Sequence, residues 1–149
     1  MSRGQFSSIA ALSLVLSACN SDRPVSATAD LPEGLRITVT RVATHPFLAR
    51  FDLSVTVNGS NGCVASSDLF PDTGGVSRRN IYVGATGLLY VIGQFDARVF
   101  DGRACSVMLR EFRFLEQERQ YLGAFDVTEG GRWTFLPAVI RPEQPFERP

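Results

Sequence analysis

Residues 50–59 read RFDLSVTVNG, and this stretch decides the fold class. Its apolar side chains occupy every second position: Phe51, Leu53, Val55 and Val57. A period of two predicts a β-strand with one buried face, and the Asn58-Gly59 pair that follows is a typical turn. The stretch therefore predicts one strand of an antiparallel sheet that packs on a core.

Similar short runs recur at residues 35–40, 95–99 and 125–127, with turn residues between them. About seven such strands predict a single all-β domain over residues 31–140, folded as a small antiparallel β-sandwich or barrel. Residues 106–122 are ambiguous, because Ser106 suits a helix start and Gly123 a helix end. We favour strands with a bulge near Arg110 and keep an α+β domain with a helix at 106–122 as the alternative.

Side-chain parity predicts the register of two hairpins. A loop of residues 100–102 pairs odd positions with odd positions, and these share one face: Phe95, Ala97, Val99, Cys105, Val107 and Leu109. A two-residue loop would place Asp96 and Arg98 on that face instead, so we expect the longer loop, with Gly102 at positive φ. The same arrangement around residues 129–131 puts Phe125 and Val127 on one face with Trp133 and Phe135.

The first residues have the pattern of an export signal. Arg3 precedes an apolar run, Ile9 to Ala18, that is too short to span a bilayer as a helix. The run ends in Leu16-Ser17-Ala18-Cys19, which resembles the lipobox of bacterial lipoproteins. The resemblance covers residues 1–19 only, and no family of the domain itself is identified.

The resemblance implies that residues 1–18 are a signal peptide and that Cys19 becomes the lipidated first residue of the mature chain. Residue 20 is Asn rather than Asp, which favours an outer-membrane lipoprotein facing the periplasm over one retained in the inner membrane. Residues 19–30 are then predicted to be a flexible tether. Residues 141–149 contain three prolines and are predicted to be an extended tail.

The charged residues and cysteines limit the function further. Without Arg3, the basic residues number 14 against 15 acidic ones, so no strong field attracts nucleic acid. With Cys19 lipidated, Cys63 and Cys105 remain, and export into an oxidising compartment favours a disulfide between them. A two-cysteine metal site would lack histidine partners and CxxC spacing.

The residues most often used in catalysis do not form an enzyme signature. His45 is the single histidine and lacks a nucleophile motif beside it. Asp72-Thr73-Gly74 matches the triplet of aspartic proteases, but Pro71 stands where that family has apolar strand residues, so we interpret the triplet as a turn. Asp68 and Asp72 match no calcium-loop spacing, and Arg78-Arg79 is interpreted as a solvated turn. We therefore expect no catalytic residue, cofactor or metal.

Three functions follow as hypotheses. The first is a non-enzymatic, lipid-anchored envelope module that binds another envelope protein or assists assembly. The second is a binding protein for a small molecule or glycan, with a ligand platform built from Tyr90, Tyr121 and Trp133. The third, and least favoured, is a hydrolase that uses His45 or Asp72.

Overall fold

The computed structural model describes residues 23–147. The predicted signal peptide and Cys19 lie outside these residues, as do the last two residues of the chain. No helix within the described part is long and apolar enough to cross a membrane.

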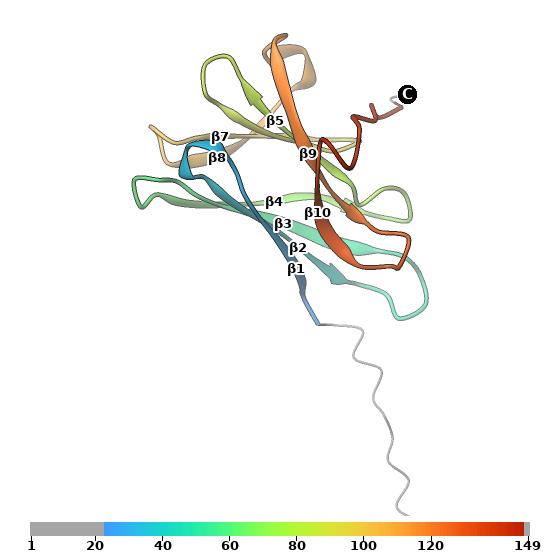
Figure 1. Ribbon diagram of the computed structural model, residues 1–149. Helices are drawn as coiled ribbons and strands as arrows, with labels where there is room; N and C mark the ends of the chain where they lie inside the picture. Colours follow the sequence, from blue (N-terminus) through green and yellow to red (C-terminus); the bar gives the residue numbers. More distant parts are fainter. Residues whose placement is uncertain (1–22, 148–149) are drawn as a thin grey trace, which may run out of the picture.

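Two antiparallel sheets pack face to face as a β-sandwich (Figure 1). The four-stranded sheet has the order β1 (Val25–Asp30), β2 (Arg36–Ala43), β3 (Phe51–Asn58), β4 (Val64–Asp72). The six-stranded sheet has the order β10 (Trp133–Pro137), β9 (Arg119–Val127), β5 (Arg79–Gly84), β6 (Leu89–Ile92), β7 (Ala97–Asp101), β8 (Ser106–Arg110). The all-β sandwich is thus confirmed, with ten strands instead of seven.

The core between the sheets follows the alternation of the sequence. From the four-stranded sheet, β2 and β3 contribute Ile37, Val39, Leu53, Val55 and Val57, all buried. The six-stranded sheet contributes chiefly Ile81, Leu89, Val91, Phe100, Phe125 and Trp133. Each such side chain contributes about 1.5–3 kcal/mol when it leaves water, so this core is the main source of stability.

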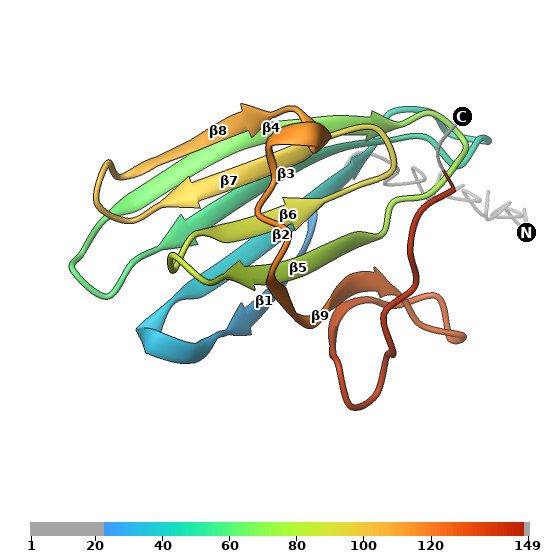
Figure 2. The same ribbon diagram turned by 90° about the horizontal axis from the view of Figure 1, so that it is seen from above.

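The outer face of the six-stranded sheet is also covered. The segment between β8 and β9, which includes a 3-10 turn at Phe112–Phe114, crosses this face (Figure 2). Its buried Leu115 forms a second cluster with five buried residues of the sheet: Tyr82, Tyr90, Ile92, Ala97 and Val99. Phe146 of the C-terminal tail packs on the same cluster. The central strands β5, β6 and β7 of the six-stranded sheet are therefore buried on both faces.

The favoured interpretation of residues 106–122 as strands is confirmed, since β8, the 3-10 turn and β9 occupy those residues and the alternative helix does not form. One predicted segment boundary was wrong. Residues 25–30, predicted as part of the tether, form the edge strand β1. Ala27 and Ala29 point into the core, and hydroxyl groups of β1 and β2 hydrogen-bond across the outer face, as between Thr28 and Thr38. Alanine and hydroxyl side chains give too little hydrophobic contrast to reveal the period of two.

The β9–β10 hairpin has the predicted register. Phe125 pairs with Phe135 and Val127 with Trp133. The backbone N–H of Thr128 donates to the carbonyl of Arg132 at 2.9 Å, which leaves a three-residue loop that ends in Gly131 at φ 78°. The left-handed conformation at the last loop position is what a three-residue hairpin loop requires.

The β7–β8 hairpin does not have the predicted register, in which a loop of residues 100–102 would pair Val99 with Arg103. Val99 pairs with Met108 and Phe100 with Val107, so odd positions face even ones, and the turn comprises residues 102–105. Gly102 is outside the left-handed region. The parity argument assumed one buried face, but Val99 and Phe100 are both buried, on opposite faces. Parity therefore gives no preference for either register at this strand.

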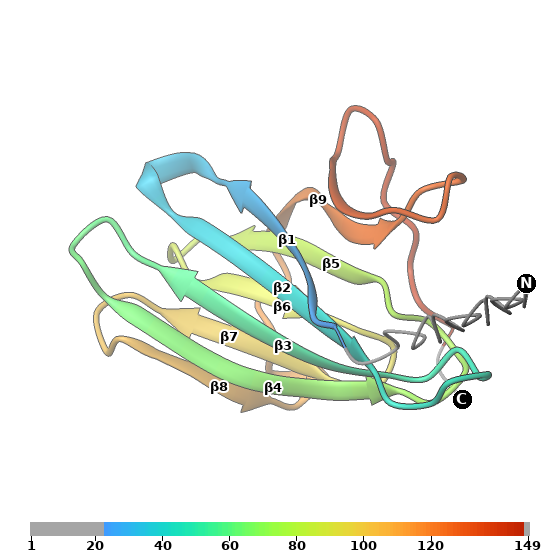
Figure 3. The same ribbon diagram turned by 90° about the horizontal axis from the view of Figure 1, so that it is seen from below.

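The turns of the sandwich gather at two opposite ends (Figure 3). Since neighbouring strands are antiparallel, the loops 31–35, 59–63, 85–88 and 102–105 share one end, here called the far end. β1 begins at the opposite end, the near end, together with the loops 44–50, 73–78, 93–96 and 128–132. This separation of the two ends decides where a partner and a membrane can contact the domain.

Candidate binding site

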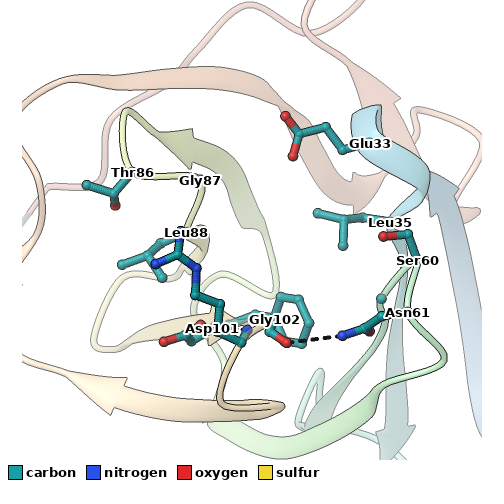
Figure 4. A pocket seen from close by; sticks show the side chains of 12 residues that line it. Glu33, Leu35, Ser60, Asn61, Thr86, Gly87, Leu88, Asp101 and Gly102 are labelled. Carbon is teal, nitrogen blue, oxygen red and sulfur yellow. Dashed lines mark hydrogen bonds between the residues drawn. The ribbon is translucent and has the colours of Figure 1, made fainter.

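A cleft of about 520 Å³ opens at the far end (Figure 4). Four turns that are distant in the sequence line it, two from each sheet. The lining residues are Glu33, Leu35, Gly59, Ser60, Asn61, Thr86, Gly87, Leu88, Phe100, Asp101, Gly102 and Arg103. Such a cluster of loops at one end of a sandwich is a common place for recognition.

The cleft combines an apolar floor with a polar rim. Leu35, Leu88 and Phe100 are half-buried or buried and form the apolar part. The rim residues are exposed and carry both charge signs together with hydroxyl and amide groups: Glu33, Ser60, Asn61, Thr86 and Arg103. In Figure 4, Glu33 and Ser60 of one sheet lie across the opening from Thr86 and Asp101 of the other. The arrangement suits hydrogen bonds and ion pairs around an apolar contact.

The predicted disulfide between Cys63 and Cys105 is confirmed and lies directly at this end of the sandwich, with 5.7 Å between the two Cα atoms. It joins the β3–β4 turn to the β7–β8 turn, and so joins the two sheets. Asn61 adds a second link, because its side-chain amide donates to the carbonyl of Gly102 at 3.5 Å and its Oδ1 accepts from the N–H of Cys63. One side of the cleft is therefore held in place before any partner arrives.

Backbone strain concentrates at the same end. Among residues 23–147, two non-glycine residues have positive φ, namely Glu33 at 63° and Cys105 at 50°. A left-handed conformation in a residue with a Cβ is unfavourable by roughly 1 kcal/mol or more. For Cys105 the disulfide supplies a reason. Glu33 has no covalent link comparable to the disulfide of Cys105. Its strained backbone holds a carboxylate at the rim of the cleft.

A buried ion pair of the six-stranded sheet lies at the near end and hydrogen-bonds to β4 of the other sheet. Arg79 and Asp96 are almost fully buried, and Nη2 lies 3.9 Å from Oδ1. Asp96 also accepts from the N–H of Phe70 in β4, and Arg79 donates to four backbone carbonyls, that of Phe70 included. Burial lowers the pKa of the Arg79 guanidinium, and Asp96 opposes that effect. The interpretation of Arg78-Arg79 as a solvated turn was therefore wrong for Arg79.

Arg78 has a different role, because it holds the C-terminal tail. Its guanidinium donates to the side chain and carbonyl of Gln144 and lies 4.4 Å from the ring centre of Phe146. Tyr82 donates to Glu143 at 2.8 Å. The tail has no regular structure within residues 141–147, and it is fastened to the outer face of the six-stranded sheet. It lies away from the cleft.

The predicted aromatic platform does not form. Trp133 lies in the core between the sheets, and its indole N–H donates to the carbonyl of Val39 at 3.0 Å. Tyr90 and Tyr121 belong to the cluster on the opposite face of the six-stranded sheet, where the Tyr90 hydroxyl donates to Glu116. A strand alternates its side chains between two faces, and the prediction had no means to tell which face each aromatic would occupy.

His45 and Asp72 both organise local turns. Nδ1 of His45 accepts from the N–H groups of Phe47 and Leu48, at 3.1 and 3.0 Å. The Asp72 carboxylate accepts from the N–H groups of Gly74 and Gly75 and from the hydroxyl of Ser77. Within residues 23–147, no three His, Cys, Asp or Glu side chains gather in a way that could hold a metal ion. Both residues lie at the near end, away from the cleft.

The cleft residues were not identified from the sequence, although a signal exists. The sequence predicted turns at Asn58-Gly59 and at residues 100–102, next to two of the turns that line the cleft, and in an antiparallel meander every second turn lies at the same end. Counting strands from β1 would have brought these turns together with residues 31–35.

No protein-family model matches the chain, and no curated protein or solved structure is detectably similar to it. Evidence about its function therefore comes from the sequence and from the geometry described above.

Proposed function

We propose that this chain is a lipid-anchored protein of the cell envelope, held at the outer membrane through Cys19, that binds another envelope protein through the far-end cleft. The observation that carries the proposal is the position of the cleft. It lies at the end of the sandwich opposite to the start of β1, the strand that follows the proposed anchor. An anchor at Cys19 would present the cleft away from the membrane, where a partner can reach it.

The form of the cleft favours a protein partner. Small-molecule sites bury most of the ligand surface in a concave, mainly apolar pocket. Here the rim consists of exposed turns with side chains of both charge signs, around an apolar floor formed by three side chains. Such a rim suits a protruding loop of a folded partner, which brings its own complementary charges. The disulfide supports this reading, because a rim held in place loses less conformational entropy on binding.

The hypothesis of small-molecule or glycan binding depended on Tyr90, Tyr121 and Trp133 lining one cavity. These residues lie on two different faces of the six-stranded sheet, and none of them lines the cleft. The hydrolase hypothesis depended on a second titratable group beside His45 or Asp72 in a cleft. Both residues instead make hydrogen bonds within their own turns. Of the three hypotheses, the geometry therefore supports protein binding best.

Site-specific photocrosslinking in the native envelope tests the proposal. A photoreactive residue in place of Ser60, at the rim, should give a discrete protein adduct, whereas the same residue at the exposed Val139 should give none. Equal labelling from both positions, or none from Ser60 at normal protein abundance, would contradict the proposal. Stabilisation of the purified protein by glycan fragments, without a protein adduct, would favour the second hypothesis.

Glu33→Gly provides a variant that separates binding from folding. Glycine tolerates the left-handed backbone at position 33, so the free energy of unfolding of the variant should equal that of the parent or exceed it by up to about 1 kcal/mol. It also removes the rim carboxylate and should weaken the adduct formed from Ser60. A Glu33→Gly protein that crosslinks as well as the parent would remove Glu33 from the proposed interface.

A further inference from the structure

We propose that the loop of residues 44–50, between β2 and β3, inserts its tip into the lipid surface that carries the anchor, and so holds the sandwich upright with the cleft facing away. The tip consists of Phe47 and Leu48, whose side chains are 90% and 49% exposed. The inference rests on the proposed anchor at Cys19 and adds a second contact between the domain and the membrane.

The position of the loop brings it to the membrane. Val25, the first residue of β1, pairs with Arg41, only three residues before the loop begins at Thr44. Figure 3 shows the loop at the end of the sandwich where β1 starts. Six residue steps separate Val25 from Cys19, and even a fully extended chain covers at most about 20 Å in that distance. The near end is therefore confined to the bilayer surface whenever Cys19 carries lipid.

The backbone of the loop is prepared for an apolar medium. A backbone N–H that enters a lipid interface without a partner is unfavourable, so such groups need internal acceptors. The N–H groups of Phe47 and Leu48 both donate to Nδ1 of His45. Pro46 has no N–H, and the N–H of Arg50 donates to the carbonyl of Leu48. His45 thus has a role here, since it satisfies the two donors of the apolar tip.

Several of the exposed apolar residues lie at the near end, whereas Val64 at the far end and Val139 and Ile140 after β10 are exceptions. Other large apolar side chains at the near end are also exposed, namely Phe70, Val76 and Phe95, and the rings of Phe70 and Phe95 lie 5.3 Å apart. The far end instead presents charged and polar side chains around the cleft. Arg50, an exposed cation beside the tip, suits anionic headgroups. The two ends of the domain therefore match a lipid surface and an aqueous partner respectively.

Tryptophan scanning of the full-length lipidated protein tests the inference. The protein is reconstituted in vesicles of phosphatidylethanolamine and phosphatidylglycerol, with or without brominated acyl chains. Phe47→Trp should lose most of the emission that the new indole adds when the lipids are brominated. Ser60→Trp at the far end and Val139→Trp, at a side chain 92% exposed on the flank, should lose none beyond the parent protein. The buried Trp133 gives the same background in all variants.

Each result decides between the proposals. Intact mass with diacylglyceryl on Cys19, together with unquenched Phe47→Trp, would overturn the docking of the loop and leave the anchor standing. Quenching at Val139 but not at residue 47 would show that the domain lies on its side, and would also overturn the inference. A mass without lipid would overturn the proposed anchor and the inference with it.

Discussion

Replacement of Asp96 by alanine is expected to lower the free energy of unfolding by about 3–5 kcal/mol. The variant would leave the Arg79 guanidinium buried without its carboxylate, and the N–H of Phe70 without its acceptor. At 3.9 Å and an effective dielectric constant of about 20, the attraction that is lost is of the order of 4 kcal/mol. The four backbone carbonyls that accept from Arg79 reduce the destabilisation, because they still compensate part of its charge. The buried N–H of Phe70, left without an acceptor, increases the destabilisation.

Equilibrium unfolding in urea, followed by the fluorescence of Trp133, measures the change. Trp133 is the single tryptophan and lies in the core between the sheets, so its emission reports the whole sandwich. Asp30→Ala is the matched control. The Asp30–Arg36 pair is closer, at 2.6 Å, but both side chains are mostly exposed, so water screens the attraction and no measurable change is expected.

Asp96→Asn separates the two contributions of this residue. The amide oxygen of asparagine can still accept from the N–H of Phe70, whereas the charge is lost, so the destabilisation should fall between that of Asp96→Ala and the parent. Two results would refute the reasoning. One is a change of less than about 1 kcal/mol for Asp96→Ala, well below the cost of an unpaired buried charge. The other is an equal effect of Asp30→Ala.

Three further predictions concern the turns and the tail. Removal of the disulfide by Cys63→Ala with Cys105→Ala should lower the free energy of unfolding by up to about 4 kcal/mol, because the two cysteines are 42 residues apart. Urea titration measures this change, and an unchanged midpoint would refute the prediction. Gly131→Val should lower the free energy of unfolding by at least about 1 kcal/mol, because φ at this position is 78°. Gly102→Val should lower it by less, because φ there is outside the left-handed region and an added Cβ meets only ordinary contacts. The reverse order would contradict the two hairpin conformations. Burial and the hydrogen bond to Glu143 raise the pKa of Tyr82 to about 12, so the stability that this group contributes is complete below about pH 10 and is lost as the pH rises towards 12. Tyr82→Phe should therefore reduce the fall in the free energy of unfolding between about pH 10 and 12. An equal fall in both proteins would contradict the raised pKa.

The sequence predicted best the strands in which hydrophobic and polar residues alternate strongly. β2 and β3 were recognised because Ile37, Val39, Val55 and Val57 all point into one core while their neighbours face solvent. The register of the β9–β10 hairpin was predicted, since Phe125 and Trp133 belong to the inner core. In both cases the large apolar side chains near the turn lie on one face and the polar ones on the other, which is the condition that the parity argument requires.

The register of β7 and β8 could not be predicted by the same argument. Val99 packs under the segment that crosses the outer face, and Phe100 packs between the sheets. Long-range packing of residues near Leu115 thus decides the burial of Val99, and nothing local in residues 95–109 indicates it. On β8 the apolar residues Met108 and Leu109 are both exposed at the edge of the sheet, so their hydrophobicity did not enforce a register either.

The missed strand β1 affects the interpretation of both ends of the domain. With residues 25–30 assigned to the tether, the turn at 31–35 precedes the first strand, and Glu33 has no reason to join the turns at 59–63 and 102–105. The tether would also span twelve residues, with a reach of up to about 40 Å, enough for the domain to turn freely above a membrane. Once β1 pairs with β2, the turn completes the cleft and only six residue steps remain to Cys19. The same six-residue strand thus places the turn at 31–35 in the wall of the proposed binding site and brings the opposite end close enough to the proposed anchor for Phe47 to reach lipid.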